Sequence, residues 1–149
     1  MEWAQIFALL TILTLGVVYG TDMFFAVVGR SALAQVSEAG ITEVMGRLHE
    51  YADRRMPFFG VLGIISTLCL AVAAPSLYSI VAFGAQLIHL GIYFRVSKPI
   101  NESLTAAAIR GESLSNAQHL QRRWDSVIVP RALMLGIAML CVALSLVHA

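Results

Sequence analysis

The residues best suited to chemistry in this chain lie together at positions 46–57, which read Gly-Arg-Leu-His-Glu-Tyr-Ala-Asp-Arg-Arg-Met-Pro. His49 and Asp53 are four positions apart, so on a helix they share a face and can hydrogen-bond or meet a ligand together. A histidine oriented by a carboxylate is a suitable general base near neutral pH. Arg54 and Arg55 follow directly and supply positive charge for a developing anion. The stretch therefore predicts a base with neighbouring cations.

A second interpretation of the same stretch is a solvated collar of charge at a helix end. Pro57 closes the stretch, and the apolar run 58–74 follows at once. Because proline has no amide hydrogen to donate, it suits either a kink or the start of the next helix. From Ile41 onward, a short amphipathic helix leading into this stretch is expected.

The composition indicates an integral membrane protein. The chain has 149 residues, of which 58% are hydrophobic and 13% charged, and its mean hydropathy is +0.78. Charged residues make up about a quarter of a typical soluble domain, roughly twice their share in this chain. No basic stripe with interleaved aromatic residues occurs, so nucleic-acid binding has no support. Cys69 and Cys141 lie in separate apolar runs without metal-type spacing and are expected to be small buried hydrophobes.

Four apolar runs predict an all-α fold. We expect a single domain over residues 1–149, an integral membrane four-helix bundle with short amphipathic helices in its two long polar connections. The first run is too long for a signal-peptide core, and Glu2 stands where such a peptide has positive charge. Gly16 and Gly20 form a GxxxG pattern, which favours close helix packing within the chain and leaves a homo-oligomer open. The predicted spans are 3–28, 58–74, 77–96 and 127–147.

Polar residues interrupt two of these spans. Asp22 lies in the first, and a carboxylate there usually faces the bundle interior or a watery cavity; the alternative is that the helix ends early. Gln86, His89 and Tyr93 lie in the third, at positions that share one helical face. A polar stripe on a membrane helix points inward rather than at lipid. The alternative is that His89 is a structural histidine in the core, with one neighbouring group as its hydrogen-bond partner.

The basic residues predict the orientation. All ten Lys and Arg residues fall within 30–55 or 95–131, the two segments that join spans one to two and three to four. The positive-inside rule places both segments in the cytoplasm and both termini outside, in a multi-pass protein of the cell inner membrane. At 1.5 Å per residue, Asp22 and His89 lie about 10 Å from the cytoplasmic ends of their spans. Both are therefore expected to meet Tyr93, His49 and Asp53 in the inner half of the bundle.

Three short motifs resemble those of a known family. They are Gly20-Thr-Asp-Met-Phe-Phe25 at the end of the first span, Pro99-Ile-Asn101-Glu102 after the third, and Arg123-Trp124-Asp125 with Arg131 leading into the fourth. With the four-span layout, which covers most of the chain, they resemble the anthrone-oxygenase-like family of small four-helix membrane proteins. Most members are bacterial and of unassigned function.

The resemblance implies an activity. Family members with an assigned function oxidise anthrones to anthraquinones with molecular oxygen, without metal or flavin. By resemblance, Asn101, Trp124 and Arg131 are the positions to carry over. The family often has a histidine four residues after that tryptophan, whereas this chain has Ile128. Either His49 or His89 takes over that role here, or the chemistry differs.

The residues fit such a reaction without a cofactor. An anthrone must lose a proton from its acidic methylene, and His49 with Asp53, or His89 with Asp22, can accept it. Arginine, amide and phenol groups stabilise the resulting enolate. Flat, apolar substrates dissolve in the bilayer, which accounts for a site within it. We expect catalytic roles for His49, Asp53, His89, Asp22 and Arg131, and substrate contacts from Tyr93, Asn101, Trp124, Arg54, Arg55 and Gln86.

Two other functions stay open. In the first, His49 and His89 are axial ligands of a haem, or join Asp22, Asp53 and His119 around a divalent metal, although no spacing enforces either site. In the second, the chain is a non-enzymatic membrane subunit or a small transporter whose polar residues hold helices together. An absorption spectrum of the purified protein separates the first from the rest, because haem gives a Soret band.

The predicted orientation can be tested by labelling intact cells. An impermeant thiol reagent should label an Ala149→Cys variant and leave a Ser113→Cys variant unlabelled, because only the termini are expected outside. Labelling at position 113 without labelling at the C-terminus would overturn the topology.

Overall fold

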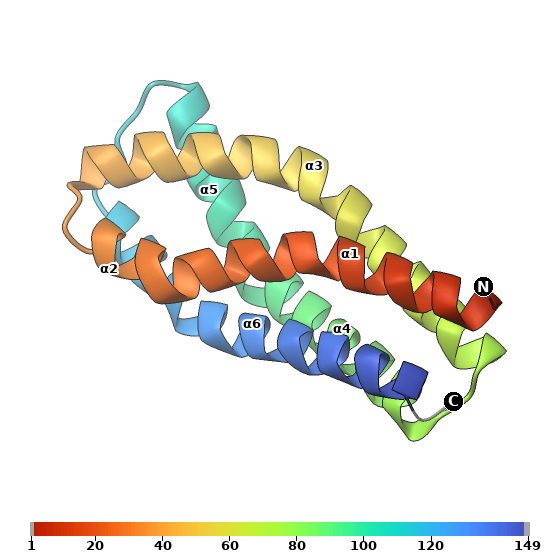
Figure 1. The fold of residues 1–149 in the computed structure, drawn as a ribbon. Helices are drawn as coiled ribbons and strands as arrows, with labels where there is room; N and C mark the ends of the chain where they lie inside the picture. Colours follow the sequence, from red (N-terminus) through yellow and green to blue (C-terminus); the bar gives the residue numbers. More distant parts are fainter. Residues whose placement is uncertain (1, 148–149) are drawn as a thin grey trace.

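Four long helical rods, each built around one apolar run, form the computed structural model, which describes residues 2–147 (Figure 1). The first and third rods each contain one π-helical turn. Residue 1 and residues 148–149 of the predicted 1–149 domain lie outside the described part. The elements are α1 (Trp3–Phe24), η1 (Phe25–Gly29), α2 (Arg30–Leu33), α3 (Glu38–Ala73), α4 (Leu77–Ile92), η2 (Tyr93–Ser97), α5 (Lys98–Ile109) and α6 (Ala117–Val147).

Each rod is long and apolar enough to cross a membrane, as in a multi-pass membrane protein. At 1.5 Å per residue the rods measure about 46–54 Å, against about 30 Å for the hydrocarbon core of a bilayer. The helices therefore run well past the predicted spans. Helical segments of the polar connections, α2 and α5 among residues 2–147, run on from the first and third rods. Helix α3 begins at Glu38, with the Ser37 hydroxyl accepting a hydrogen bond from the Gly40 amide at 3.2 Å.

Helix α3 passes through Pro57 without ending. Because proline cannot donate, the carbonyl of Asp53 loses its helical partner, which permits bending. Figure 1 shows that α3 changes direction in its middle part. A helix starting at Pro57, one of the two predicted roles of this proline, is not found, because α3 runs through it. The predicted break between the spans 58–74 and 77–96 is confirmed, since α3 ends at Ala73 and α4 starts at Leu77 behind an N-cap at Ser76.

The rods pack as a bundle with both polar connections at one end. Helix α1 packs against α3 and α6, α4 against α6, and α5 against α3. The start of α1, the end of α6 and the turn 74–76 lie together at one end, called here the short-turn end (Figure 1). The connections 34–37 and 110–116 lie at the opposite end. This arrangement puts the two basic segments on one side.

Two separate hydrophobic clusters fill the bundle. The cluster toward the short-turn end contains Ala8, Leu15, Leu70, Ala82, Ala85, Leu135, Ala138 and Val142. The cluster toward the polar connections contains Ala26, Leu33, Ile41, Met45, Ile100, Leu104, Ala117, Trp124 and Ile128.

Large apolar side chains also cover the outside of the bundle. Leu13, Val72 and Leu140 are each exposed by more than half of their surface. Soluble proteins rarely expose apolar surface on this scale, whereas lipid tails solvate it well. The outer surface therefore suits contact with a lipid bilayer.

Gly46 allows a close approach between α3 and α5. A Cβ atom at this position would lie 2.5 Å from the carbonyl oxygen of Leu104 and 2.5 Å from the Cβ of Ala108. The first is a backbone atom that cannot move aside alone. We expect Gly46→Ala to lower the free energy of unfolding by about 1–3 kcal/mol through overpacking, measured by denaturant titration in detergent.

The matched control is Gly20→Ala, another helical glycine, where a Cβ would meet nothing within 4 Å. Alanine should stabilise that position slightly, by about 0.5–1 kcal/mol. Equal effects of the two substitutions would contradict the close α3–α5 approach.

Candidate functional site

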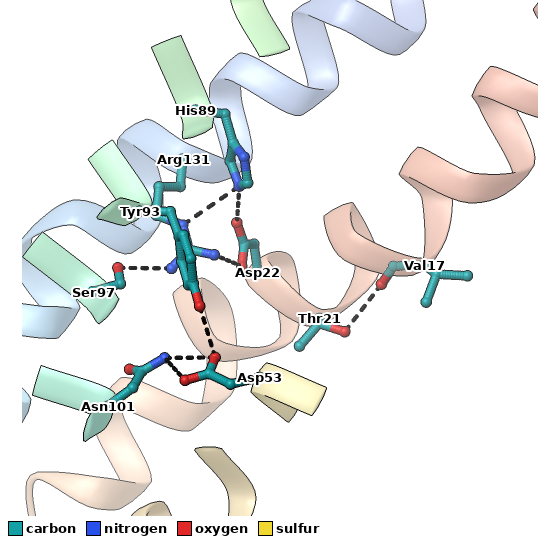
Figure 2. A network of polar contacts seen from close by, with 9 residues as sticks. All are labelled: Val17, Thr21, Asp22, Asp53, His89, Tyr93, Ser97, Asn101 and Arg131. Atoms are coloured by element: carbon teal, nitrogen blue, oxygen red, sulfur yellow. Dashed lines mark hydrogen bonds and ion pairs between the residues drawn. The ribbon is translucent and has the colours of Figure 1, made fainter. Parts of the chain in front are cut away.

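A layer of polar side chains crosses the bundle between the two hydrophobic clusters. All four rods contribute to it, and the side chains point toward one another (Figure 2). This group, called here the polar layer, consists of Asp22 from α1, Asp53 from α3, His89 from α4, Tyr93 and Ser97 from η2, Asn101 from α5, and Arg131 from α6.

Arg131 lies at the centre of the polar layer. Its Nη2 donates to Oδ1 of Asp22 at 2.9 Å, and its Nη1 donates to the Ser97 hydroxyl at 2.8 Å. Arg131 and Asp22 are both buried, with 6% and 3% of their surface exposed. A buried ion pair holds only when both groups are well hydrogen-bonded, and these contacts meet that requirement.

His89 shares the Asp22 carboxylate with Arg131. Its Nε2 lies 3.1 Å from Oδ2 of Asp22 and 3.5 Å from Nε of Arg131. Since one ring nitrogen cannot donate and accept at once, the shorter contact is best assigned as Nε2–H donating to the carboxylate. That tautomer leaves the Nδ1 lone pair as the basic position of the ring. The carboxylate therefore fixes which nitrogen can accept a proton.

Asp53 anchors the other half of the polar layer. The Tyr93 hydroxyl donates to Oδ1 of Asp53 at 2.9 Å, and Nδ2 of Asn101 donates to both carboxylate oxygens at 3.1 and 3.2 Å. The Arg131 guanidinium lies 5.6 Å from the centre of the Tyr93 ring, so a cation–π contact joins the two halves. Asp53 and Tyr93 are only partly buried, unlike Asp22, so the layer approaches the surface here.

The predicted pair of His49 and Asp53 does not form. His49 is buried, its ring centre lies 5.6 Å from that of Trp124, and its Nε2 has no hydrogen-bond partner among residues 2–147. His49 and Asp53 lie on one face of α3, as predicted. The Asp53 carboxylate, however, accepts its hydrogen bonds from Tyr93 and Asn101. His49 lies one turn farther toward the polar connections, within the hydrophobic cluster there.

The two arginines after Asp53 point away from the polar layer. Arg54 is exposed and pairs with Glu50 at 3.2 Å on the same helix. Arg55 is exposed and lies 5.3 Å from the centre of the Tyr51 ring. Neither is among the residues that the structure brings together with Asp22 and His89. The cation of the polar layer is Arg131.

Gln86 belongs to a second, smaller polar group nearer the short-turn end. Its Nε2 donates to the Thr67 hydroxyl at 2.6 Å, and that hydroxyl lies 3.3 Å from the one of Thr11. Sequence reasoning missed both threonines and Ser97. Ser97 follows Tyr93 by four positions and extends the face of Gln86, His89 and Tyr93, so helical spacing could have revealed it. The threonines gave no signal beyond lying in apolar runs.

Trp124 links the polar layer to the cluster that contains His49. The Arg131 guanidinium lies 5.7 Å from the centre of the indole ring, and the Phe25 ring meets that ring edge-on at 5.2 Å. The indole Nε1 has no partner among residues 2–147. Trp124 therefore fixes the position of the Arg131 side chain by packing.

The helices depart from regular geometry where they carry the polar layer. The π-turn η1 begins three residues after Asp22, and the π-turn η2 contains Tyr93 and Ser97. Pro130 precedes Arg131 within α6. Such turns are frequent at functional sites, because they aim side chains that a regular helix would place elsewhere.

No metal-ligand cluster is apparent in the described part of the chain: no three His, Cys, Asp or Glu side chains there are grouped to hold a metal ion. The fold and the polar layer define the class, an all-helical bundle of four rods able to cross a membrane around a buried Asp–Arg–His group. No protein-family model, curated protein or solved structure matches the chain.

Removing one partner of the buried ion pair should lower the free energy of unfolding far more than removing both. Arg131→Met leaves the Asp22 carboxylate buried without its cation, and we expect a loss of about 3–5 kcal/mol in the free energy of unfolding. Adding Asp22→Asn should recover part of that loss, a coupling of about 1–3 kcal/mol in a double-mutant cycle. Additive losses would show that the two groups do not interact.

Proposed function

We propose that this chain is a multi-pass protein of the cell inner membrane, with both termini outside and the polar layer at the cytoplasmic boundary of the hydrocarbon core. Helical rise gives the depth: α1 climbs about 29 Å from Trp3 to Asp22, and α4 with η2 climbs about 24 Å from Leu77 to Tyr93. These heights approach the full thickness of the core, about 30 Å. The segregation of all ten basic residues to the polar-connection side supports the orientation.

Exposed aromatic and basic side chains support this depth. Tyr51, Phe94 and Arg55 are exposed near the level of the polar layer, and Trp3 is exposed at the short-turn end. Aromatic and arginine side chains prefer the two interfaces of a bilayer. In this placement the rods extend past the inner interface, and the connections 34–37 and 110–116 lie in the cytoplasm.

We further propose that the polar layer is the active site of an oxygenase-like enzyme for a flat, apolar substrate such as an anthrone or a related polyphenol. The observation that carries this proposal is the 3.1 Å contact between Asp22 and Nε2 of His89, which leaves Nδ1 as the basic nitrogen of a ring whose Nε2 edge lies beside the Arg131 cation. Proton removal next to a fixed positive charge favours an enolate. His89 is therefore the proposed base, in preference to His49, which pairs with no carboxylate among residues 2–147.

The proposed reaction balances without a resident cofactor. His89 takes one proton from the substrate methylene, and the carbanion is oxidised by molecular oxygen and combines with it at the same carbon. The resulting peroxide anion takes the proton back from His89. The hydroperoxide then loses its remaining C–H proton as the O–O bond breaks, so one oxygen atom stays as the second carbonyl group of the quinone and the other leaves in water. Arg131 and Tyr93 would stabilise the enolate oxygen, and Asn101 would hold Asp53 in position. A Soret band in the purified protein would instead favour the haem alternative.

Agreement between the resemblance and the geometry supports the proposal. Asn101 and Arg131, two of the three positions carried over from the anthrone-oxygenase-like family, lie in the polar layer, and Trp124 contacts Arg131. Asn101 comes from α5, whereas Trp124 and Arg131 both come from α6, so the placement of Asn101 in the same layer as Arg131 does not follow from the motifs alone. The alternative is a non-enzymatic membrane subunit, and it is favoured by the complete pairing of Asp22 and Arg131 within the chain.

His89→Gln separates these two functions. Oxygen uptake with anthrone as the substrate should fall by about 10²–10⁴-fold, the usual contribution of a general base, while a folded bundle persists because glutamine can still hydrogen-bond Asp22. The matched control is His119→Gln, since His119 is exposed in the first turn of α6, away from the polar layer. An unchanged rate of oxygen uptake in His89→Gln would show that His89 is not the base of the reaction.

A further inference from the structure

Two exposed arginines on α3 direct their side chains back along the helix toward the polar connections. The Arg54 guanidinium pairs with Glu50 at 3.2 Å, and the Arg55 guanidinium lies 5.3 Å from the centre of the Tyr51 ring. Each partner precedes its arginine by four positions, about one helical turn. Both charged groups therefore lie near the level of residues 50–51, on the polar-connection side of Asp53, although the two arginines follow Asp53 in the chain.

Arg55 is the surplus charge of this stretch. Arg47 bonds to Glu43 and Glu50, and Arg54 shares Glu50 with it, so these four charges balance. No carboxylate among residues 2–147 pairs with Arg55, whose printed contact is the face of an aromatic ring. A guanidinium group presents five N–H donors in a planar fork that matches a phosphate group. The donors of Arg55 are thus available to an anion from outside the chain.

An apolar groove begins about one helical turn beyond the two arginines. It is lined by Pro57, Phe58, Val61, Leu62 and Ile65. Phe58 follows Arg54 by four positions, and Leu62 follows Arg55 by seven, so the arginines and the groove lie on one face of α3. Three of the lining residues expose more than half of their surface, namely Phe58, Val61 and Ile65. The groove therefore opens outward, directly below the arginine side chains.

The groove has the length that one acyl chain occupies in one leaflet. From Pro57 to Ile65 it runs about 12 Å along α3. One leaflet contributes about 15 Å to the hydrocarbon core. In the proposed placement, the groove lies on the hydrocarbon side of the polar layer, and the two guanidinium groups lie on its headgroup side. The apolar stems of the arginines cover the boundary between them.

The local charge favours an anionic headgroup over a zwitterionic one. Any phospholipid offers a phosphate to Arg55, but a choline group adds a positive charge near the surplus cation, which offsets the attraction. Anionic lipids are concentrated in the cytoplasmic leaflet, and basic residues beside a membrane helix attract them. The groove itself is apolar and distinguishes no headgroups.

We propose that this outer face of α3 binds an anionic phospholipid of the inner leaflet. Arg55 holds the headgroup phosphate, with Arg54 beside it, and one acyl chain lies in the groove across Val61. The site is separate from the polar layer. It rests on the proposed placement in the membrane and not on the oxygenase reaction, and it gives a role to the two arginines that point away from the polar layer.

Two lipids with the same chains and different headgroups test the site. A ligand that binds only the folded state raises Tm according to its affinity. Dioleoylphosphatidylglycerol, added to the detergent-purified full chain, should raise Tm at lower concentration than dioleoylphosphatidylcholine. Glycerol 3-phosphate carries the anionic group without the chains and should leave Tm unchanged. Equal effects of the two lipids, or an equal rise with glycerol 3-phosphate, would overturn the proposal.

Arg55→Gln tests the headgroup contact. Loss of one basic group at the membrane surface should weaken phosphatidylglycerol binding about fivefold and leave phosphatidylcholine binding unchanged, while Arg55→Lys should keep part of the preference. The matched control is Arg122→Gln, because Arg122 is exposed on α6 about 13 Å beyond the polar layer. This control should bind both lipids as the wild type does. An equal loss in both glutamine variants would show a diffuse effect of charge rather than a site.

Val61→Trp tests the groove, because the larger side chain fills it from an exposed position and leaves the packing inside the bundle intact. The matched control is Val72→Trp, at an exposed position of the same helix near the short-turn end. Phosphatidylglycerol affinity should fall about tenfold in Val61→Trp, the loss of roughly two buried methylene groups, and stay unchanged in Val72→Trp. Wild-type affinity in Val61→Trp would overturn the groove. Binding in detergent does not depend on orientation, so the labelling of intact cells tests the leaflet separately.

Discussion

The ion pair between Asp22 and Arg131 is the interaction on which the rest of the structure depends. Both groups are buried, and they come from helices at opposite ends of the chain. Burying either charge alone would be strongly unfavourable, so α1 and α6 must meet at one relative height and rotation. The contacts of Arg131 with Ser97 and of Asp22 with His89 then bring the third rod to the same level. Asp53 extends the alignment to α3 through Tyr93 and Asn101.

Helix packing alone would not fix this alignment. Apolar helices in a bilayer gain little by burying one another, because lipid tails are as apolar as leucine. The clusters on either side of the polar layer are built mostly from small and branched apolar residues, which tolerate sliding and rotation. Hydrogen bonds with strict geometry remove that freedom. Registration of this kind is the best-attested role of buried polar groups, and it is compatible with a catalytic role for the same residues.

The sequence predicted the parts of the fold that depend on composition and on periodicity within one helix. The four apolar runs gave the four rods and the break between the second and third, and the spacing of Gln86, His89 and Tyr93 gave a shared face. Contacts between helices were harder to predict. The spacing of His49 and Asp53 correctly placed them on one face of α3, yet it could not show that Tyr93 and Asn101 would occupy the Asp53 carboxylate. That choice depends on the height of α3 relative to α5, which no local pattern encodes.

The two π-turns have a consequence for how the sequence of each rod can change. A π-turn holds one residue more than the α-helical turn it replaces, and one added residue rotates everything beyond it by about 100°. The first and third rods therefore carry a phase shift near the polar layer, between their halves toward the short-turn end and toward the polar connections. Each half can keep its own inward apolar stripe, one matched to the hydrophobic cluster that contains Leu135 and the other to the cluster that contains Trp124. A single helical period fitted along either rod would misassign the inward face of one half.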